Sequence, residues 1–328
     1  MANNDYHEMT DFISTSMLKD FMDDPTIYFE RYISKSLDRR DPSAAMELGS
    51  VVHAVLLDQR PLRSVVYELP DHDPLLQAAS TLTAPKRDAL SDGEKAKIAK
   101  LAGVSLEDFL SAKGGKPLKE ILANVPKNIV SASGVVSKDA LAALKQENPE
   151  YEYFLKKQGK VSTDAVRQIV SSVRSNERFH GLFGNDDVIY EKPIFWESDG
   201  LKKRCCPDGL ILNRDQQKAL ILDLKVSASA LDFERSMNNF RYWVQEEHYR
   251  QGVLAEHVDM VQCDFLFICV QSEYPYHVTT WMFDPGTTEI RNEMYHDTIG
   301  DLVECYASND WSHPLTKGTQ IARFFKAK

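Results

Sequence analysis

The sequence lacks any segment typical of export or membrane insertion. Its first residues, MANNDYHEMT, contain no basic stretch followed by an apolar run. No apolar stretch approaches the roughly 20 residues that a helix needs to cross a bilayer. We therefore expect a soluble protein of the cell interior.

Cysteines are few, and their spacing argues against two common uses of this residue. The 328 residues include five cysteines, an odd number, at positions 205, 206, 263, 269 and 305. No pair has CxxC spacing, which disfavours both a disulfide framework and a zinc knuckle. We expect reduced thiols, most of them buried.

The usual signs of nucleic-acid and nucleotide binding are missing as well. The chain has 39 basic and 49 acidic residues and a formal net charge of -10, whereas proteins that coat phosphate backbones usually present a basic face. The stretch KGGKP at 113–117 is no phosphate-binding loop, because Leu110 and Pro117 stand where that motif needs glycine and Ser or Thr. Nucleotide binding is not expected. Any contact with nucleic acid must be local or assisted by metal ions.

Apolar residues at helical spacing predict the first part of the fold. The 43% hydrophobic content supports a real core. We predict N-terminal helices within residues 13–58, the last of them, at 44–58, buried and carrying His53. Residues 70–160 contain short charged helices separated by proline and glycine, with little strand signal, and we interpret this range as a helical insertion.

Strand patterns dominate the range 162–285 once its opening helix has ended. Three runs, separated by the turn Ser198-Asp199-Gly200 and by a polar tip, predict an antiparallel meander. A helix over FRYWVQEEHYRQGVLAEHV, a buried strand over CDFLFICVQ and a further strand over YHVTTWMFD follow. A C-terminal helix and tail occupy 286–328. The order predicts a single α/β domain, residues 1–328, with a mixed sheet flanked by helices.

Two of the predicted strands are interrupted by charged residues. If the second hairpin is centred on Asp215-Gln216, Asp208 and Asp223 lie opposite each other, with Cβ atoms about 4.5–5.5 Å apart. Lys225 points to the same face as Asp223. Carboxylates this close repel by roughly 4 kcal/mol, and a divalent cation relieves the repulsion; oxygen ligands favour Mg²⁺ or Mn²⁺. The alternative is that Lys225 merely neutralises two carboxylates at a strand end.

These motifs resemble those of a known superfamily. Pro207-Asp208 followed by Asp223-Leu224-Lys225 is similar to the PD-(D/E)xK nuclease signature, whose core has the same order of elements. GSVVH with Gly49 and His53, YEKPIFW with Glu191, and QEEHY with Gln245 and Tyr249 resemble its RecB-like branch. Most closely, residues 13–58 and 162–270 are similar to the RecE family of phage-type recombination exonucleases, the exonuclease VIII type.

The resemblance implies a role for each matching residue. The implied metal ligands are Asp208, Asp223, the Leu224 carbonyl, Glu191 and His53, the last as a ligand or as a group that positions water. It makes Lys225 the catalytic lysine, with Gln245 and Tyr249 orienting this lysine or the DNA backbone. Cys206 replaces the arginine that usually precedes the PD pair. The missing phosphate contact would then come from the nearby basic residues Lys202, Lys203 and Arg204.

The resemblance also implies an activity and partners. It implies a Mg²⁺-dependent exodeoxyribonuclease, with Mn²⁺ able to substitute, that degrades linear double-stranded DNA 5′ to 3′. The 3′ single-stranded tails would serve recombination with a single-strand annealing recombinase, and the enzyme would be a ring-shaped trimer or tetramer of phage or prophage origin in the bacterial cytoplasm. Three alternatives stay open: a structure-selective or single-strand nuclease on the same core, a non-catalytic DNA-end-binding module, and a separate binding module within the insertion.

Overall fold

A computed structural model describes residues 9–38, 43–113, 116–133, 135–179 and 182–313. Gly114 and Gly115 of the KGGKP stretch and the tail after residue 313 lie outside this range. The chain divides into two compact units, one formed by residues 1–60 with 165–328 and the other by 61–164. Within the described ranges, every helix is too short or too polar to span a bilayer.

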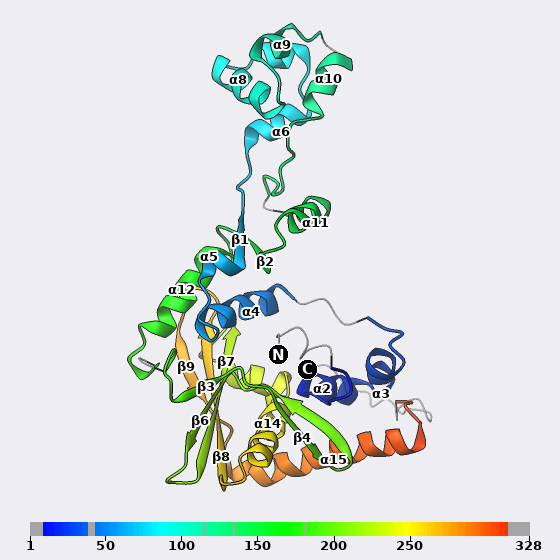
Figure 1. The fold of residues 1–328 in the computed structure, drawn as a ribbon, viewed down its shortest axis with the longest axis vertical. Helices are drawn as coiled ribbons and strands as arrows, with labels where there is room; N and C mark the ends of the chain where they lie inside the picture. Colours follow the sequence, from blue (N-terminus) through cyan, green and yellow to red (C-terminus); the bar gives the residue numbers. More distant parts are fainter. Residues whose placement is uncertain (1–8, 39–42, 114–115, 134, 180–181, 314–328) are drawn as a thin grey trace, which may run out of the picture. The chain divides into compact units, whose positions relative to one another are not determined.

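The first unit is built on a five-stranded sheet of order β3-β6-β7-β8-β9 (Figure 1). Strands β7 and β8 run parallel, and the other neighbouring strands are antiparallel. Strand β8, which lies between β7 and β9, is nearly continuous in apolar residues, as expected for a strand covered on both faces. The bounds are β3 Val188–Tyr190, β6 Gly209–Asn213, β7 Lys218–Ser227, β8 Gln262–Gln271 and β9 Val278–Trp281.

Helices flank this sheet (Figure 1). Helix α14 contacts β7 and β8, and it also contacts α2 and α15, while α4 contacts β7. The predicted α/β class with a mixed sheet flanked by helices is therefore confirmed. The helices of this unit are α2 Thr15–Asp23, α3 Pro25–Tyr28, the π-helix Phe29–Ile33, α4 Ala44–Leu56, most of α12 Thr163–Arg174, the short 3-10 turns Glu177–Phe179 and Pro285–Thr287, α13 Phe233–Asn239, α14 Tyr242–Glu256 and α15 Thr288–Ser308.

The second unit consists of short helices and one pair of strands. Strands β1 (Val66–Leu69) and β2 (Tyr153–Lys156) are parallel, a pairing that the sequence did not reveal because each strand has only four residues. Buried Ile98 and Phe109 belong to the apolar cluster of the helices between these strands. The helices are α5 Leu62–Val65, α6 Pro74–Ser80, α7 Ala84–Asp88, α8 Asp92–Leu101, α9 Leu106–Ser111, α10 Lys116–Leu122 and α11 Lys138–Glu147.

The predicted three-strand meander is broken in two places. Its first run splits into β3 and β4 (Ile194–Ser198), and its second into β5 (Leu201–Cys205) and β6; β4 and β5 form a separate two-stranded sheet. Pro193 and Pro207 lie in the two breaks, and proline cannot donate a hydrogen bond to a ladder. The antiparallel order of the three runs is as predicted, but the first hairpin is divided between the main sheet and the separate sheet of β4 and β5.

The strand register continues across both breaks. Tyr190 pairs with Gly209 before the breaks and Ile194 pairs with Cys205 after them. Counting one residue on from Tyr190 and one back from Gly209 therefore places Glu191 opposite Asp208. Gly209 also pairs with Leu222, so Asp208 lies opposite Asp223, as the predicted hairpin requires. Glu191 directly follows β3, Asp208 directly precedes β6 and Asp223 lies within β7; we call these three residues the carboxylate row.

Gly252 permits a close approach of α14 to β4 and β5. A Cβ atom at this position would lie 2.7 Å from Trp196 Cζ3 and 2.9 Å from Cys205 Sγ, whereas one added at Gly49 in α4 would meet nothing within 4 Å. We expect Gly252→Ala to lower the free energy of unfolding of the first unit by about 1–3 kcal/mol. Gly49→Ala, the matched control, should leave it unchanged or raise it by up to about 1 kcal/mol. Chemical denaturation followed by circular dichroism measures both, and equal stability of Gly252→Ala and wild type would contradict this packing.

Candidate metal centre

Side chains from three distant segments converge on one end of the carboxylate row. His53 comes from α4, Glu191 follows β3 and Asp208 precedes β6; one ligand atom of each lies within 4.8 Å of the others. Glu191 has a φ of 45°, so the chain leaves the extended conformation at this residue. An imidazole and two carboxylates together make a donor set suited to a divalent cation.

His53 lies between several acceptors. Its Nε2 is 2.9 Å from the Leu224 carbonyl oxygen and 3.6 Å from Asp208 Oδ2, and its Nδ1 is 3.9 Å from Glu191 Oε1. Burial alone would lower the pKa of His53, but Asp208 and Glu191 raise it to about 9. The imidazole is therefore protonated at neutral pH. The same acceptors that stabilise the proton on His53 suit a divalent cation bound in place of that proton.

Asp208 and His53 both bond to the backbone of Leu224, on the two sides of its Cα atom. Asp208 Oδ2 accepts a hydrogen bond of 2.6 Å from the Leu224 N–H, while the Leu224 carbonyl is bonded to His53. Burial raises the pKa of the Asp208 carboxyl to about 7, and the nearby charge of Asp223 adds to the rise, against the opposing effect of His53. A cation at this site would favour the ionised carboxylate.

Asp223 contacts Lys225 of its own strand and Gln245 of α14. It is 1% exposed, its Oδ2 lies 2.5 Å from Lys225 Nζ, and its Oδ1 accepts a 2.5 Å hydrogen bond from Gln245 Nε2. Burial by itself would lower the pKa of Lys225, but Asp223 and Asp208 raise it. The lysine is thus a fixed positive charge beside the three-residue cluster. Asp223 lies in the same row of the sheet but outside that cluster.

The remaining predicted residues differ in their exposure to solvent. Tyr249 packs in the core against Phe265, with ring centroids 6.1 Å apart. Lys203 is fully buried and pairs with Asp199 at 2.7 Å, and Arg204 is buried too. Neither of these basic side chains reaches solvent, so we withdraw the DNA contact suggested for both. Lys202 is exposed and keeps that suggestion.

Two residues at the site escaped the sequence analysis. Lys19 in α2 places its Nζ 4.9 Å from the centroid of the Tyr242 ring, and Lys225 Nζ lies 5.3 Å from the same centroid. The helical spacing of the apolar residues around position 19 predicted the helix, but spacing alone does not tell which strand end a flanking lysine approaches. Lys19 and Tyr242 bring α2 and α14 to the carboxylate row.

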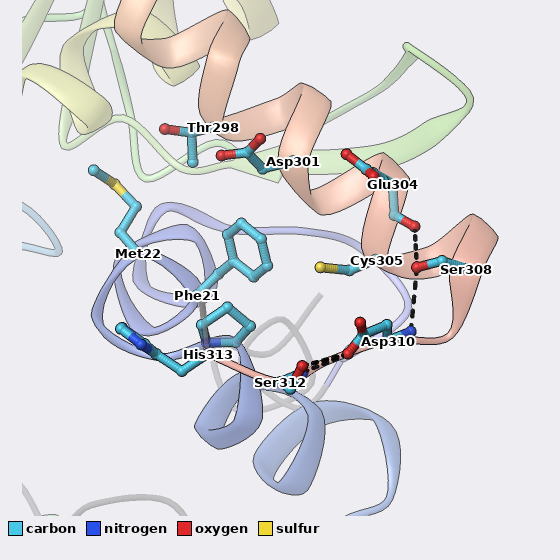
Figure 2. Close-up of a pocket in the computed structure, with 11 residues that line it drawn as sticks. Phe21, Met22, Thr298, Asp301, Glu304, Cys305, Ser308, Asp310, Ser312 and His313 are labelled. Carbon is cyan, nitrogen blue, oxygen red and sulfur yellow. Dashed lines mark hydrogen bonds between the residues drawn. The ribbon is translucent and has the colours of Figure 1, made fainter. Parts of the chain in front are cut away.

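A separate cavity of about 500 Å³ lies between α2 and the end of α15 (Figure 2). Its lining includes Asp301, Glu304 and Asp310, and it contains none of the predicted site residues. The three carboxylates would repel a phosphate backbone. This cavity is therefore a poor candidate for the functional site.

The affinity of the free protein for Mn²⁺ should rise between about pH 6 and pH 9. The reason is that Asp208, with a pKa of about 7, and His53, with a pKa of about 9, must lose their protons to bind a metal ion. Calorimetry in two buffers of different ionisation enthalpy measures both the affinity and the protons released. His53→Ala should remove the upper part of the pH dependence, and Glu304→Gln, in the acidic cavity, should bind as wild type does. Uptake that does not vary over this pH range would contradict the assignment.

Comparison with known proteins supports the fold. No protein-family model matches the chain, and no curated protein matches it. The crystal structure of a candidate exonuclease from Eubacterium rectale is similar over 99% of this chain and 96% of its own, with 11% sequence identity and a TM-score of 0.54. The solved structure of SSO0001 matches 77% of this chain and 83% of its own at 13% identity, but its TM-score of 0.24 carries no argument. At this level of identity, the first likeness shows a shared fold.

Proposed function

We propose that this protein is a metal-dependent nuclease, a hydrolase of phosphodiester bonds. The observation that carries the proposal is the row of Glu191, Asp208 and Asp223 across three strands, with His53 at one end and Lys225 at the other. The sequence resemblance to the PD-(D/E)xK signature supports it. So does the fold shared with a protein described as a candidate exonuclease.

The residues of the site have distinct tasks under this proposal. His53, Glu191 and Asp208 would hold a divalent cation, which supplies Lewis-acid activation of water and neutralises charge on the phosphate. Lys225 brings a permanent positive charge that stabilises the negative charge developing on the phosphate. Asp223 fixes the position of Lys225, and Gln245 in turn fixes Asp223 from α14.

We infer a narrower activity from the resemblance to the RecE family. The enzyme would degrade linear double-stranded DNA from its ends, 5′ to 3′, with Mg²⁺ as its metal and Mn²⁺ able to substitute. The 3′ single-stranded tails would pass to an annealing recombinase. A ring-shaped trimer or tetramer that encloses the DNA, and a phage or prophage origin, belong to the same proposal.

Purified protein should digest linear duplex DNA in Mg²⁺ and leave closed circular duplex intact, and EDTA should stop the reaction. Asp208→Asn and Lys225→Ala should each slow digestion by about 100-fold or more, because each removes charge that the reaction needs. Glu304→Gln is the control and should keep full activity. Separate labels on the 5′ and 3′ ends measure polarity.

The outcomes of this assay separate the proposals. Equal attack on linear and circular duplex would refute the exonuclease assignment and favour a structure-selective nuclease. Binding of DNA ends by a wild-type protein that never cleaves them, in Mg²⁺ or Mn²⁺, would refute the nuclease and favour the DNA-end-binding module.

A further inference from the structure

A second lysine lies beside the catalytic candidate Lys225. Lys19 Nζ and Lys225 Nζ are 4.9 Å and 5.3 Å from the centroid of the same Tyr242 ring, so the two nitrogens can be no farther apart than the sum of these distances. The Tyr242 ring is itself stacked on Phe267, with centroids 5.5 Å apart and an interplanar angle of 24°. Two ammonium groups, one from α2 and one from β7, therefore lie within cation–π distance of one aromatic ring.

The two lysines beside this ring differ in their carboxylate partners. Lys225 pairs with Asp223, but Lys19 makes no ion pair with any carboxylate in the described part of the chain. The carboxylates next to Lys19 on α2 are already engaged: Asp20 pairs with Arg31 at 2.5 Å, and Asp23 pairs with Arg241 at 2.6 Å. Lys225 therefore has a carboxylate partner, whereas Lys19 has none in the described part of the chain.

The environment of Lys19 disfavours an unpaired cation. Burial and the neighbouring charge of Lys225 lower the pKa of Lys19 to about 7, with Arg241 adding to the decrease and Asp223 opposing it. A bound anion would offset this repulsion. The chain supplies no such anion among its described residues, which points to a ligand.

We propose that Lys19 and Lys225 together bind one backbone phosphodiester of a nucleic-acid strand, next to the metal centre and over the Tyr242 ring. The inference rests on the proposed nuclease function and assigns Lys19 a part in it. A phosphodiester carries a single negative charge, which would offset the repulsion between the two ammonium groups. Lysine is a common phosphate ligand in proteins because its ammonium group acts as a compact point charge.

The salt dependence of cleavage tests this assignment. Each phosphate contact contributes a slope of about 0.7 for single strands and about 0.9 for duplex in a plot of log affinity against log salt concentration. For cleavage of a short labelled duplex, Lys19→Met should raise KM and should reduce the slope of log kcat/KM by about that amount. Lys19→Arg keeps the charge and should restore the wild-type slope. Lys218→Met, at the opposite end of β7, is the matched control and should change neither quantity.

The assay distinguishes failure of this inference from failure of the proposed function. If wild type cleaves DNA but Lys19→Met keeps the wild-type salt slope, Lys19 binds no phosphate and the inference is wrong, even if kcat falls. If wild type cleaves no DNA, the proposed function fails and the inference fails with it. A thermal melt of Lys19→Met confirms folding, and Lys19→Gln, which retains a polar side chain, replaces it if that variant unfolds.

Discussion

The candidate site depends on the backbone register that joins β3, β6 and β7. The β3–β6 pairing ends at Tyr190 and Gly209, one residue short of Glu191 and Asp208. The β6–β7 pairing ends at Gly209 and Leu222, one residue short of Asp208 and Asp223. A slip of one residue in either pairing would send these side chains to opposite faces of the sheet. Pro193 and Pro207 interrupt the ladder beside two of these carboxylates, and the interruption separates β4 and β5 from the main sheet.

The site also depends on positive charges that compensate its carboxylates. Carboxylates held this close need compensating positive charge, and the chain provides it from two sides. His53 on α4 is protonated between Asp208 and Glu191, and Lys225 pairs with Asp223. The two sources differ in kind, because the proton on His53 can be exchanged for a metal ion whereas the lysine charge is permanent. Under our proposals, the site binds a cation at one end and a phosphate at the other.

Much of this arrangement could be predicted from local sequence. The polar tip between two apolar runs fixes the hairpin and with it the pairing of Asp208 and Asp223, and the two-residue spacing fixes the face of Lys225. The turn at Ser198–Leu201 likewise sets the register that brings Glu191 near Asp208, so this neighbour could also have been predicted from the sequence.

What escaped prediction depends on contacts between distant segments. His53 was placed near the Leu224 carbonyl by the family resemblance alone, and nothing related Lys19 to Tyr242, because these approaches arise only when α4 and α2 pack against the sheet and α14. The burial of Lys203 is of the same kind, since an exposed turn and a strand that packs against α14 can share one sequence pattern. Anomalous diffraction from crystals soaked in Mn²⁺ tests the central claim most directly. The account predicts a peak within coordination distance of His53, Glu191 and Asp208, and a peak only in the acidic cavity at Asp301 and Glu304, or no peak at all, would contradict it.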